Sequence, residues 1–346
     1  MKAMVLTGLR RMEMREVPDP EMTAADDVLI RLKRVGVCGS DVHYYTTGRI
    51  GSQVVRYPYR VGHECSGVVE TVGPAVTNVK PGDRIAVEPA RPCFACDQCR
   101  MGRINTCRNL KFLGTPGQGP GCLCEWLVMP SHCCFPVPDS LSLDEAALVE
   151  PLSIGVYSVR QSIPMAGAKV GILGVGPIGL SCLVPTRHDG AAAVYVTDKL
   201  DDRLAAAKAA GADWTGNPDT DDVVAGIADA EPGLLDVVFE CCGEQEALDQ
   251  ALEILRPGGT LMLVGIPAVD RVSFSIDELR HREITVRNVR RQAHCVQPAI
   301  DLAASDDADV SFMLTHHFPF ETSREAFDLV DQYRDGVIKA MITLEE

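Results

Sequence analysis

Short apolar segments bounded by turn residues fill about the first 150 positions of the chain, a spacing typical of strands joined by tight turns. Residues 28–30 and 67–70 are two such segments, and Gly48 and Pro81-Gly82 are among the turn signals. Glycine and proline at these places favour sharp reversals of direction. The pattern therefore predicts a β-rich unit in the first part of the chain.

Beyond about residue 167 the pattern changes to apolar strands that alternate with helical stretches. We expect strands at 169–173, 193–197, 235–240 and 259–264, and helices at 201–210, ended by Gly211, and at 244–255, ended by Pro257-Gly258. Such alternation predicts a parallel sheet built from right-handed βαβ units. It stops near Val289, so the remaining segment either forms a third unit or returns to the first.

One proline conflicts with this pattern. Pro185 lies inside the helix that is expected after Gly179, where it removes a backbone donor and clashes with the preceding turn. We expect a kink or an early end of the helix at that point.

Length and charge narrow the possible functions. The 346 residues are enough for two domains. A net charge of −15 argues against a general binder of nucleic acids or anionic membranes, so a small molecule is the expected partner. The sequence holds no apolar run of about 18 residues, and its start lacks an apolar signal core, so we expect a cytoplasmic protein.

A glycine-rich segment follows the first strand of the expected parallel sheet. Its sequence is Gly174-Val175-Gly176-Pro177-Ile178-Gly179, a helical stretch comes next, and Asp198 ends the following strand. Glycines at these positions allow a tight turn and a close approach of the backbone to a pyrophosphate, while the acidic residue accepts from ribose hydroxyls. The segment predicts a Rossmann-type dinucleotide site, and the alternative is a glycine turn in a sheet that binds no nucleotide.

Four of the fourteen cysteines lie close together in the sequence. Cys93, Cys96, Cys99 and Cys107 are spaced C-x2-C-x2-C-x7-C. Four thiolates match a closed tetrahedral zinc site, which is structural because no coordination position stays open. An iron–sulfur cluster and unligated thiols are the alternatives, although the bacterial cluster motif has a shorter last spacing.

A more dispersed set becomes informative through its surroundings. The informative segments are 36–44, 48–51, 62–64, 80–84, 150–153, 176–179, 197–198, 314–316 and Phe318. In these segments the chain resembles the zinc-containing medium-chain dehydrogenases/reductases, in their polyol dehydrogenase branch. The resemblance implies a β-rich GroES-like catalytic domain of residues 1–155 and 290–346. It also implies a Rossmann domain of residues 156–289, with the active site between the two domains.

The same resemblance implies a catalytic zinc held by Cys38, His63 and Glu64, with Glu150 as a nearby carboxylate that ligates the metal or holds its water. One coordination position stays open, as a catalytic zinc requires. Relatives pass the substrate proton through residues that correspond to Ser40 and His43, although a structural serine and an exposed histidine are the plain alternative.

Substrate and cofactor contacts also follow from the resemblance. The polyol pocket is expected to involve Tyr44, Phe112, Glu150 and Arg291, although Gln292 replaces the tyrosine usual after the arginine. The cofactor is expected to be NAD, and two zinc ions per subunit complete the set. The expected contacts of NAD are Gly174, Gly176, Ile178, Gly179, Asp198, Arg203, Val264 and Ile266. Lys199 beside Asp198 is the one residue that could favour a 2′-phosphate.

These observations predict an NAD-dependent oxidoreductase that converts a secondary hydroxyl of a sorbitol- or xylitol-like polyol into a ketose, as a homodimer or homotetramer. Another secondary alcohol or an amino alcohol such as threonine is the close alternative. A zinc- and nucleotide-binding protein without turnover, used in structure or redox sensing, is the remote one. The pairs Cys133-Cys134 and Cys241-Cys242 are its support.

Overall fold

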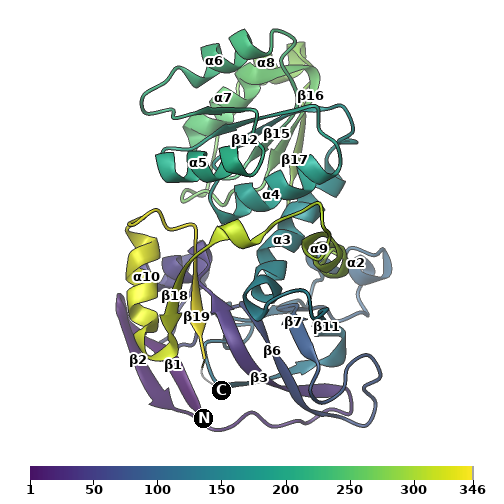
Figure 1. Ribbon diagram of the computed structural model, residues 1–346, viewed down its shortest axis with the longest axis vertical. Coiled ribbons are helices and arrows are strands. Elements are labelled where there is room, and N and C mark those ends of the chain that lie inside the picture. Colours follow the sequence, from purple (N-terminus) through teal and green to yellow (C-terminus); the bar gives the residue numbers. More distant parts are fainter. Residues whose placement is uncertain (345–346) are drawn as a thin grey trace. The chain divides into compact units, whose positions relative to one another are not determined.

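The computed structural model describes residues 1–344 and separates into two compact units (Figure 1). The first unit comprises 1–150, 296–304 and the segment from Leu314 onward, and the second comprises 151–295 and 305–313. The C-terminal segment thus returns to the first unit, apart from a short excursion at 305–313 that the sequence did not predict. Among the described residues, no helix is both long and apolar enough to cross a bilayer.

A seven-stranded sheet forms the frame of the first unit. Its strand order is β11 (Cys134–Pro136), β7 (Arg84–Val87), β6 (Glu64–Val72), β3 (Asp27–Gly36), β19 (Lys339–Thr343) and β18 (Leu314–Pro319), and β10 (Trp126–Pro130) also pairs with β3. Strands β1 (Lys2–Gly8) and β2 (Arg11–Glu16) form a separate hairpin. The predicted β-rich unit is confirmed.

Short elements complete the first unit, and several of them carry candidate site residues. They are α1 (Gly39–Thr46), β4 (Arg49–Ile50), β5 (Gln53–Val54), β8 (Ala90–Arg91), α2 (Asp97–Arg100), β9 (Lys111–Phe112), α9 (Val296–Ala303) and α10 (Ser323–Asp331). Helix α1 is anchored to α10, because Tyr45 stacks edge-on against Phe327 at 5.5 Å and donates a 2.7 Å hydrogen bond to Asp328.

The second unit is built on a six-stranded parallel sheet (Figure 1). Its order is β14 (Trp214–Gly216), β13 (Ala193–Thr197), β12 (Lys169–Leu173), β15 (Leu235–Glu240), β16 (Leu255–Leu263) and β17 (Thr285–Asn288). Its helices include α4 (Pro177–His188), α5 (Asp201–Ala209), α6 (Val223–Ala230), α7 (Gln245–Ile254) and α8 (Ile276–His281), while α3 (Leu143–Gln161) leads in from the first unit. The expected parallel βαβ arrangement is confirmed.

Helix α7 ends within one residue of the expected position, but Pro257 and Gly258 are not what ends it. The helix stops at Ile254, and Leu255 is already extended and paired with Leu235, so Pro257 and Gly258 lie inside β16. The register shifts between Leu235 and Val237, which leaves the additional residues of β16 in a bulge. The proline and the glycine therefore shape a strand irregularity instead of capping a helix.

Of the two outcomes expected at Pro185, the early end of α4 is wrong, because the helix continues to His188, while the kink stays a prediction. Proline has no N–H to donate to the carbonyl of Ser181 four residues earlier. That carbonyl faces Gly155 of α3, where a built Cβ would lie only 1.8 Å from the Ser181 oxygen. The backbones of α3 and α4 therefore pack in close contact at this point, and α4 continues past its internal proline.

Replacing Gly155 with alanine is therefore expected to destabilise the second unit by about 1–3 kcal/mol or more, since α3 and α4 must move apart. Alanine in place of glycine normally stabilises a helix interior. The predicted change in the free energy of unfolding therefore has the opposite sign to the one that helix propensity gives. Chemical denaturation measures the free energy of unfolding. Gly233→Ala is the control, because only flexible side-chain ends lie near that position, and equal stabilities of the two variants would contradict the packing argument.

Candidate metal centres and nucleotide-binding site

Three potential metal ligands meet at one end of the first unit's sheet. Cys38 directly precedes α1, while His63 and Glu64 stand at the start of β6. Strands β3 and β6 pair antiparallel with Gly36 opposite Glu64, which brings the residues after β3 to the residues that open β6. One ligand atom from each of Cys38, His63 and Glu64 lies within 4.8 Å of the others. A thiolate, an imidazole and a carboxylate fit zinc and leave one position open.

The imidazole of His63 is held by a buried carboxylate. Its Nδ1 lies 3.2 Å from Oδ2 of Asp41, which is fully buried, and Oδ1 of Asp41 accepts from the N–H of Gly62 at 3.0 Å. Burial lowers the pKa of His63, but Asp41 and then Cys38 outweigh it and raise that pKa well above its ordinary value. A carboxylate on one ring nitrogen fixes the ring and leaves the other nitrogen for a metal.

The carboxylate of Glu64 lies in a buried ion pair. Nζ of Lys339 in β19 is 2.6 and 2.8 Å from its two oxygens and donates to the carbonyl of Val37 at 3.3 Å. Both side chains are almost fully buried. Burial lowers the pKa of Lys339, but Glu64, Cys38 and Glu150 together raise it more, so the net shift is upward. Lys339 therefore holds Glu64 beside the thiol and the imidazole.

Sequence reasoning missed both Asp41 and Lys339. Asp41 lies three residues after Cys38, inside the segment that carries the family resemblance, so its position was a usable signal. Lys339 gave a weaker signal, a single cation at the start of an apolar strand. Which carboxylate it meets is decided by the pairing of β19 with β3.

The predicted proton-transfer residues lie on α1. The Ser40 hydroxyl donates to the sulfur of Cys38 at 3.3 Å, so it lies within the ligand cluster. His43 is exposed, three residues further along the same helix. Residues at this spacing share one face of a helix.

The predicted substrate residues are distributed over both units. Tyr44 is buried and donates to Oε1 of Gln53 at 3.0 Å, and the ring of Phe112 lies 5.3 Å from that of His63. Glu150 is half-buried in α3, and its charge contributes to the raised pKa of Lys339, after burial and Glu64. Arg291 belongs to the second unit and has a φ of 50°, a conformation that a long side chain seldom adopts.

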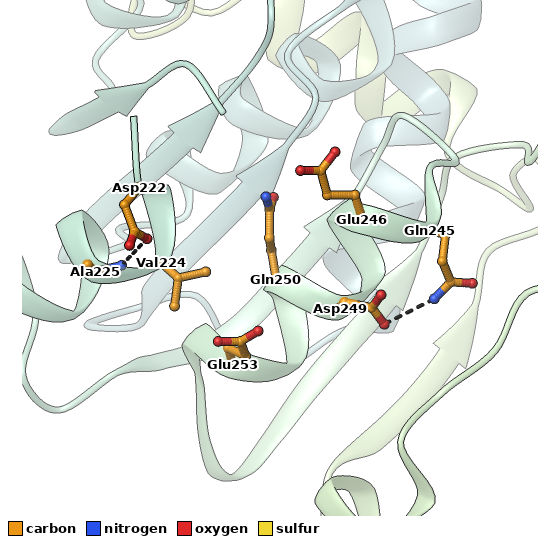
Figure 2. A pocket seen from close by; sticks show the side chains of 8 residues that line it. All are labelled: Asp222, Val224, Ala225, Gln245, Glu246, Asp249, Gln250 and Glu253. Carbon is orange, nitrogen blue, oxygen red and sulfur yellow. Dashed lines mark hydrogen bonds between the residues drawn. The ribbon is translucent and has the colours of Figure 1, made fainter. Parts of the chain in front are cut away.

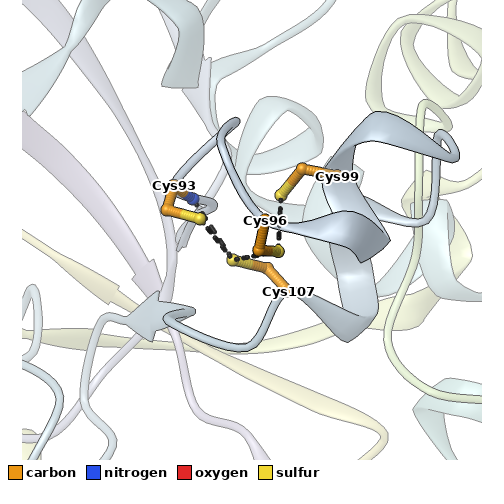
Figure 3. Close-up of side chains that lie close together, drawn as sticks. All are labelled: Cys93, Cys96, Cys99 and Cys107. Carbon is orange, nitrogen blue, oxygen red and sulfur yellow. Dashed lines mark hydrogen bonds between the residues drawn. The ribbon is translucent and has the colours of Figure 1, made fainter.

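The four cysteines predicted to form a second metal site converge around α2 (Figure 3). Sulfur–sulfur distances are 3.4 Å for Cys93–Cys107, 3.6 Å for Cys96–Cys99 and 3.9 Å for Cys96–Cys107. Backbone N–H groups, first that of Ala95, lower the pKa of Cys93 to about 6. Four sulfurs within 4.8 Å of one another fit a tetrahedral zinc with no open position.

The glycine-rich segment forms the turn between β12 and α4. Gly174 has a φ of 86°, and a Cβ on Gly179 would lie 2.0 Å from the carbonyl oxygen of Gly174, so only glycine fits there. The turn leaves the N-terminus of the twelve-residue α4 beside Gly176, its N-cap. The first N–H groups of a helix have no partner within the helix and can hold a pyrophosphate.

Asp198 directly follows the last residue of β13 and is buried. Its Oδ2 accepts from the N–H of Val175 at 2.8 Å, and its Oδ1 accepts from Leu200 at 3.0 Å, so it also shapes the glycine turn. Nη1 of Arg203 is 3.8 Å from the same carboxylate. Nζ of Lys199 lies 3.3 Å from Asp219, which raises its pKa.

The remaining predicted cofactor residues lie at the same carboxyl edge of the sheet. Ile178 is half-buried in the first turn of α4, while Val264 and Ile266 follow β16. Ile266 is 61% exposed, an unusual state for isoleucine that leaves its side chain available to a ligand.

A hollow of about 670 Å³ lies between α6 and α7, apart from all these residues (Figure 2). Its lining is mostly acidic and amide side chains, and it includes Asp222, Glu246, Asp249 and Glu253. Asp222 caps α6 through the N–H of Ala225, and Asp249 accepts from Gln245. Since these carboxylates serve local structure, the hollow is not a candidate active site.

Comparisons with known proteins agree with the geometry of these sites. Residues 24–139 match the alcohol dehydrogenase GroES-like domain, and residues 177–305 match the zinc-binding dehydrogenase domain. Sorbitol dehydrogenase of Bacillus subtilis is 36% identical over 99% of this chain and 97% of its own length. L-idonate 5-dehydrogenase of Vitis vinifera is 38% identical over 92% of this chain and 88% of its own length.

Solved structures give the same result. An Escherichia coli oxidoreductase/dehydrogenase of unknown specificity has a TM-score of 0.94 and 32% identity, over 100% of this chain and 99% of its own. A zinc-binding dehydrogenase of Sinorhizobium meliloti bound to NADP has a TM-score of 0.89 and 30% identity, and the match covers 99% of this chain and 98% of that structure's chain. The chain belongs to the zinc-containing medium-chain dehydrogenase/reductase family, in its polyol dehydrogenase branch, and it is a zinc-dependent oxidoreductase.

The two metal sites are expected to respond differently to the same cysteine-to-serine change. Cys96→Ser should remove one zinc per subunit and lower Tm by at least about 5 °C, because a structural metal contributes directly to folding. Cys38→Ser should remove the other zinc and nearly all turnover while Tm changes little. Metal analysis, thermal melts and kinetics of both variants make the comparison. An unchanged Tm for Cys96→Ser with lost turnover would contradict the assignment.

Proposed function

We propose that this protein oxidises a secondary hydroxyl of a sorbitol- or xylitol-like polyol to a ketose, with NAD as the hydride acceptor. The observation that carries the proposal is the convergence of Cys38, His63 and Glu64, which offers three ligands and one open position. The relatives named sorbitol dehydrogenase and L-idonate 5-dehydrogenase support an alcohol with several hydroxyl groups as the substrate.

The chain's own residues prepare the catalytic centre. A zinc ion held there acts as a Lewis acid that lowers the pKa of the substrate hydroxyl. Asp41 fixes the ring of His63, and Lys339 fixes the carboxylate of Glu64 and offsets part of the negative charge of the ligands. Glu150 acts as a further carboxylate, either as a ligand or by holding a water molecule.

The proton of the substrate leaves through α1 in this proposal. Ser40 lies beside Cys38 and carries a hydroxyl that can accept one proton and donate another. His43 is exposed on the same helix, so its imidazole is in contact with solvent. Ser40 therefore takes up the proton at the centre, and His43 releases it to solvent.

Polar side chains near the metal ligands select the substrate. The hydroxyl of Tyr44 and the carboxylate of Glu150 offer partners for several substrate hydroxyls, and the ring of Phe112 lies beside that of His63. Arg291 of the second unit is kept as a substrate residue because the family resemblance implies it. A short alcohol carries fewer hydroxyl groups and makes fewer of these contacts, which lowers its transition-state binding. Threonine or another amino alcohol is the second candidate, since the ligand set alone does not distinguish it.

NAD is the proposed cofactor because the carboxylate of Asp198 stands at the end of β13. Gly174, Gly176, Gly179 and the first turn of α4 with Ile178 would hold the pyrophosphate, and Arg203, Val264 and Ile266 contribute further contacts. A 2′-phosphate is repelled by Asp198, while Lys199 is engaged by Asp219.

We also propose that the protein is cytoplasmic and forms a homodimer or homotetramer. Among the described residues no disulfide joins any of the cysteines, as expected in a reducing compartment. Strand β17 ends the parallel sheet and offers its outer edge to a second copy, and Val269 and Ile276 are largely exposed.

A substrate panel tests the proposed activity. Sorbitol and xylitol should reduce NAD with a kcat/KM at least about tenfold higher than threonine or ethanol, because only they pair with the polar pocket. Initial rates at matched pH, with protein of measured zinc content, give the comparison. A higher value for threonine or ethanol would rule out the polyol assignment.

Cofactor choice is tested at Asp198. Asp198→Ala should weaken the binding of NAD and relieve the repulsion of NADP. The ratio of kcat/KM with NAD to kcat/KM with NADP should therefore fall by about one to three powers of ten. Asp198→Asn is the matched control for the glycine turn, because its oxygen can still accept from Val175 while the charge is lost. Preference of the unmodified protein for NADP, or an unchanged ratio in Asp198→Ala, would show that Asp198 does not make the selection.

A further inference from the structure

The strand order of the parallel sheet defines a crevice at its carboxyl edge. Strands β13 and β14 lie on one side of β12, and β15, β16 and β17 lie on the other. Dinucleotides cross such sheets where the strand order reverses, between β12 and β15 here. The loop after β12 carries the glycine turn, and residues 241–243 after β15 form the facing wall, where sequence reasoning considered only a redox role for the Cys241-Cys242 pair.

Glu240 ends β15 and fixes this wall. It is 1% exposed, and its Oε1 accepts from the N–H of Cys242 at 2.8 Å, the N–H of Gly243 at 2.5 Å and the thiol of Cys242 at 3.1 Å. Its main-chain carbonyl accepts from Val264 at 2.9 Å and Gly265 at 2.8 Å. One residue therefore ties together the loops that follow β15 and β16.

The three loops touch through their backbones. A Cβ on Gly174 would lie 2.8 Å from Cβ of Cys242, and one on Gly265 would lie 2.4 Å from the nitrogen of Gly243 and 2.8 Å from Oε2 of Glu240. With so little space, a shift of the Cys242 loop must move the glycine turn. Glu240 can thus control the position of the turn without touching a ligand.

The hydrogen bonds that Glu240 accepts bear on where a phosphate can bind. The N–H groups of Cys242 and Gly243 stand at the edge of the crevice, where free donors attract anions. Glu240 occupies both of them, and within residues 1–344 its side chain is held by N–H and S–H donors. The first turn of α4 is left as the place that offers N–H groups to a pyrophosphate.

We propose that Glu240 is a positioning residue for the dinucleotide. It holds the wall of residues 241–243 against the glycine turn, so that the pyrophosphate binds at the N-terminus of α4. This inference rests on the proposed use of NAD and adds a residue outside the glycine turn on which cofactor affinity depends.

NADH binding to the purified zinc-loaded protein, followed by fluorescence titration, tests this role. Glu240→Ala should raise the Kd of NADH at least tenfold and raise the KM for NAD, with kcat at saturating NAD changed less than threefold. Glu240→Gln should stay within about threefold of the unmodified protein, because an amide oxygen can still accept from the two N–H groups. Glu244→Gln removes a charge from the exposed N-cap of α7 and should change nothing.

Thermal melts separate positioning from simple stabilisation. Glu240→Ala with a lower Tm but an unchanged Kd, measured well below that Tm, overturns the inference. So does Glu240→Gln with a loss as large as that of Glu240→Ala, since charge and not hydrogen bonding would then be responsible. Should Glu240→Ala fail to fold, Glu240→Asp keeps the charge on a shorter side chain and should show the same rise in Kd.

Failure of the unmodified protein to bind NADH has a different meaning. That result removes the proposed function and, with it, the inference about Glu240. Binding by the unmodified protein combined with an unchanged Kd in Glu240→Ala and Glu240→Asp removes the inference alone.

Discussion

The antiparallel pairing of β3 with β6 is the constraint on which the catalytic centre depends. The register places Gly36 opposite Glu64, so the chain that leaves β3 at Cys38 meets the chain that enters β6 at His63. A Cβ at Gly36 would lie 2.3 Å from Oε2 of Glu64, which explains why glycine stands there. Strand β19 pairs with the same end of β3 and delivers Lys339 to Glu64. Any slip of the register would separate the ligands.

Buried charge is compensated individually at each site. Asp41 faces His63, Lys339 faces Glu64, and the carboxylate of Glu240 is held by backbone N–H groups. An uncompensated ion in such surroundings costs several kcal/mol, so each of these groups requires its partner. The partners also fix the orientation of the side chains, because a hydrogen-bonded carboxylate has few alternative positions. Stability of the folded chain and geometry of its sites thus depend on the same contacts.

Local spacing in the sequence was sufficient for several features. Four cysteines within a short, turn-rich segment are brought together by their spacing alone. The glycine turn and Asp198 are positioned by a strand, a helix and the next strand, which follow one another along the chain. Strands such as 169–173 and 235–240 are mostly apolar because they are buried on both faces of a parallel sheet, and both were predicted with their observed bounds. Features of this kind depend on neighbours along the chain.

Tertiary structure decided the rest, because the partners are far apart in sequence. Nothing local links Lys339 to Glu64, which is 275 residues away, or marks Glu240 as the residue that joins two loops. Pro185 suggested a kink or an early helix end, but α4 continues to His188 and packs closely against Gly155 of α3. Pro257 suggested a helix stop, but pairing of Leu255 with Leu235 began the strand earlier. In each case packing between distant segments outweighed a local preference, because the sequence states each residue's preference and only the fold supplies the atoms that meet it.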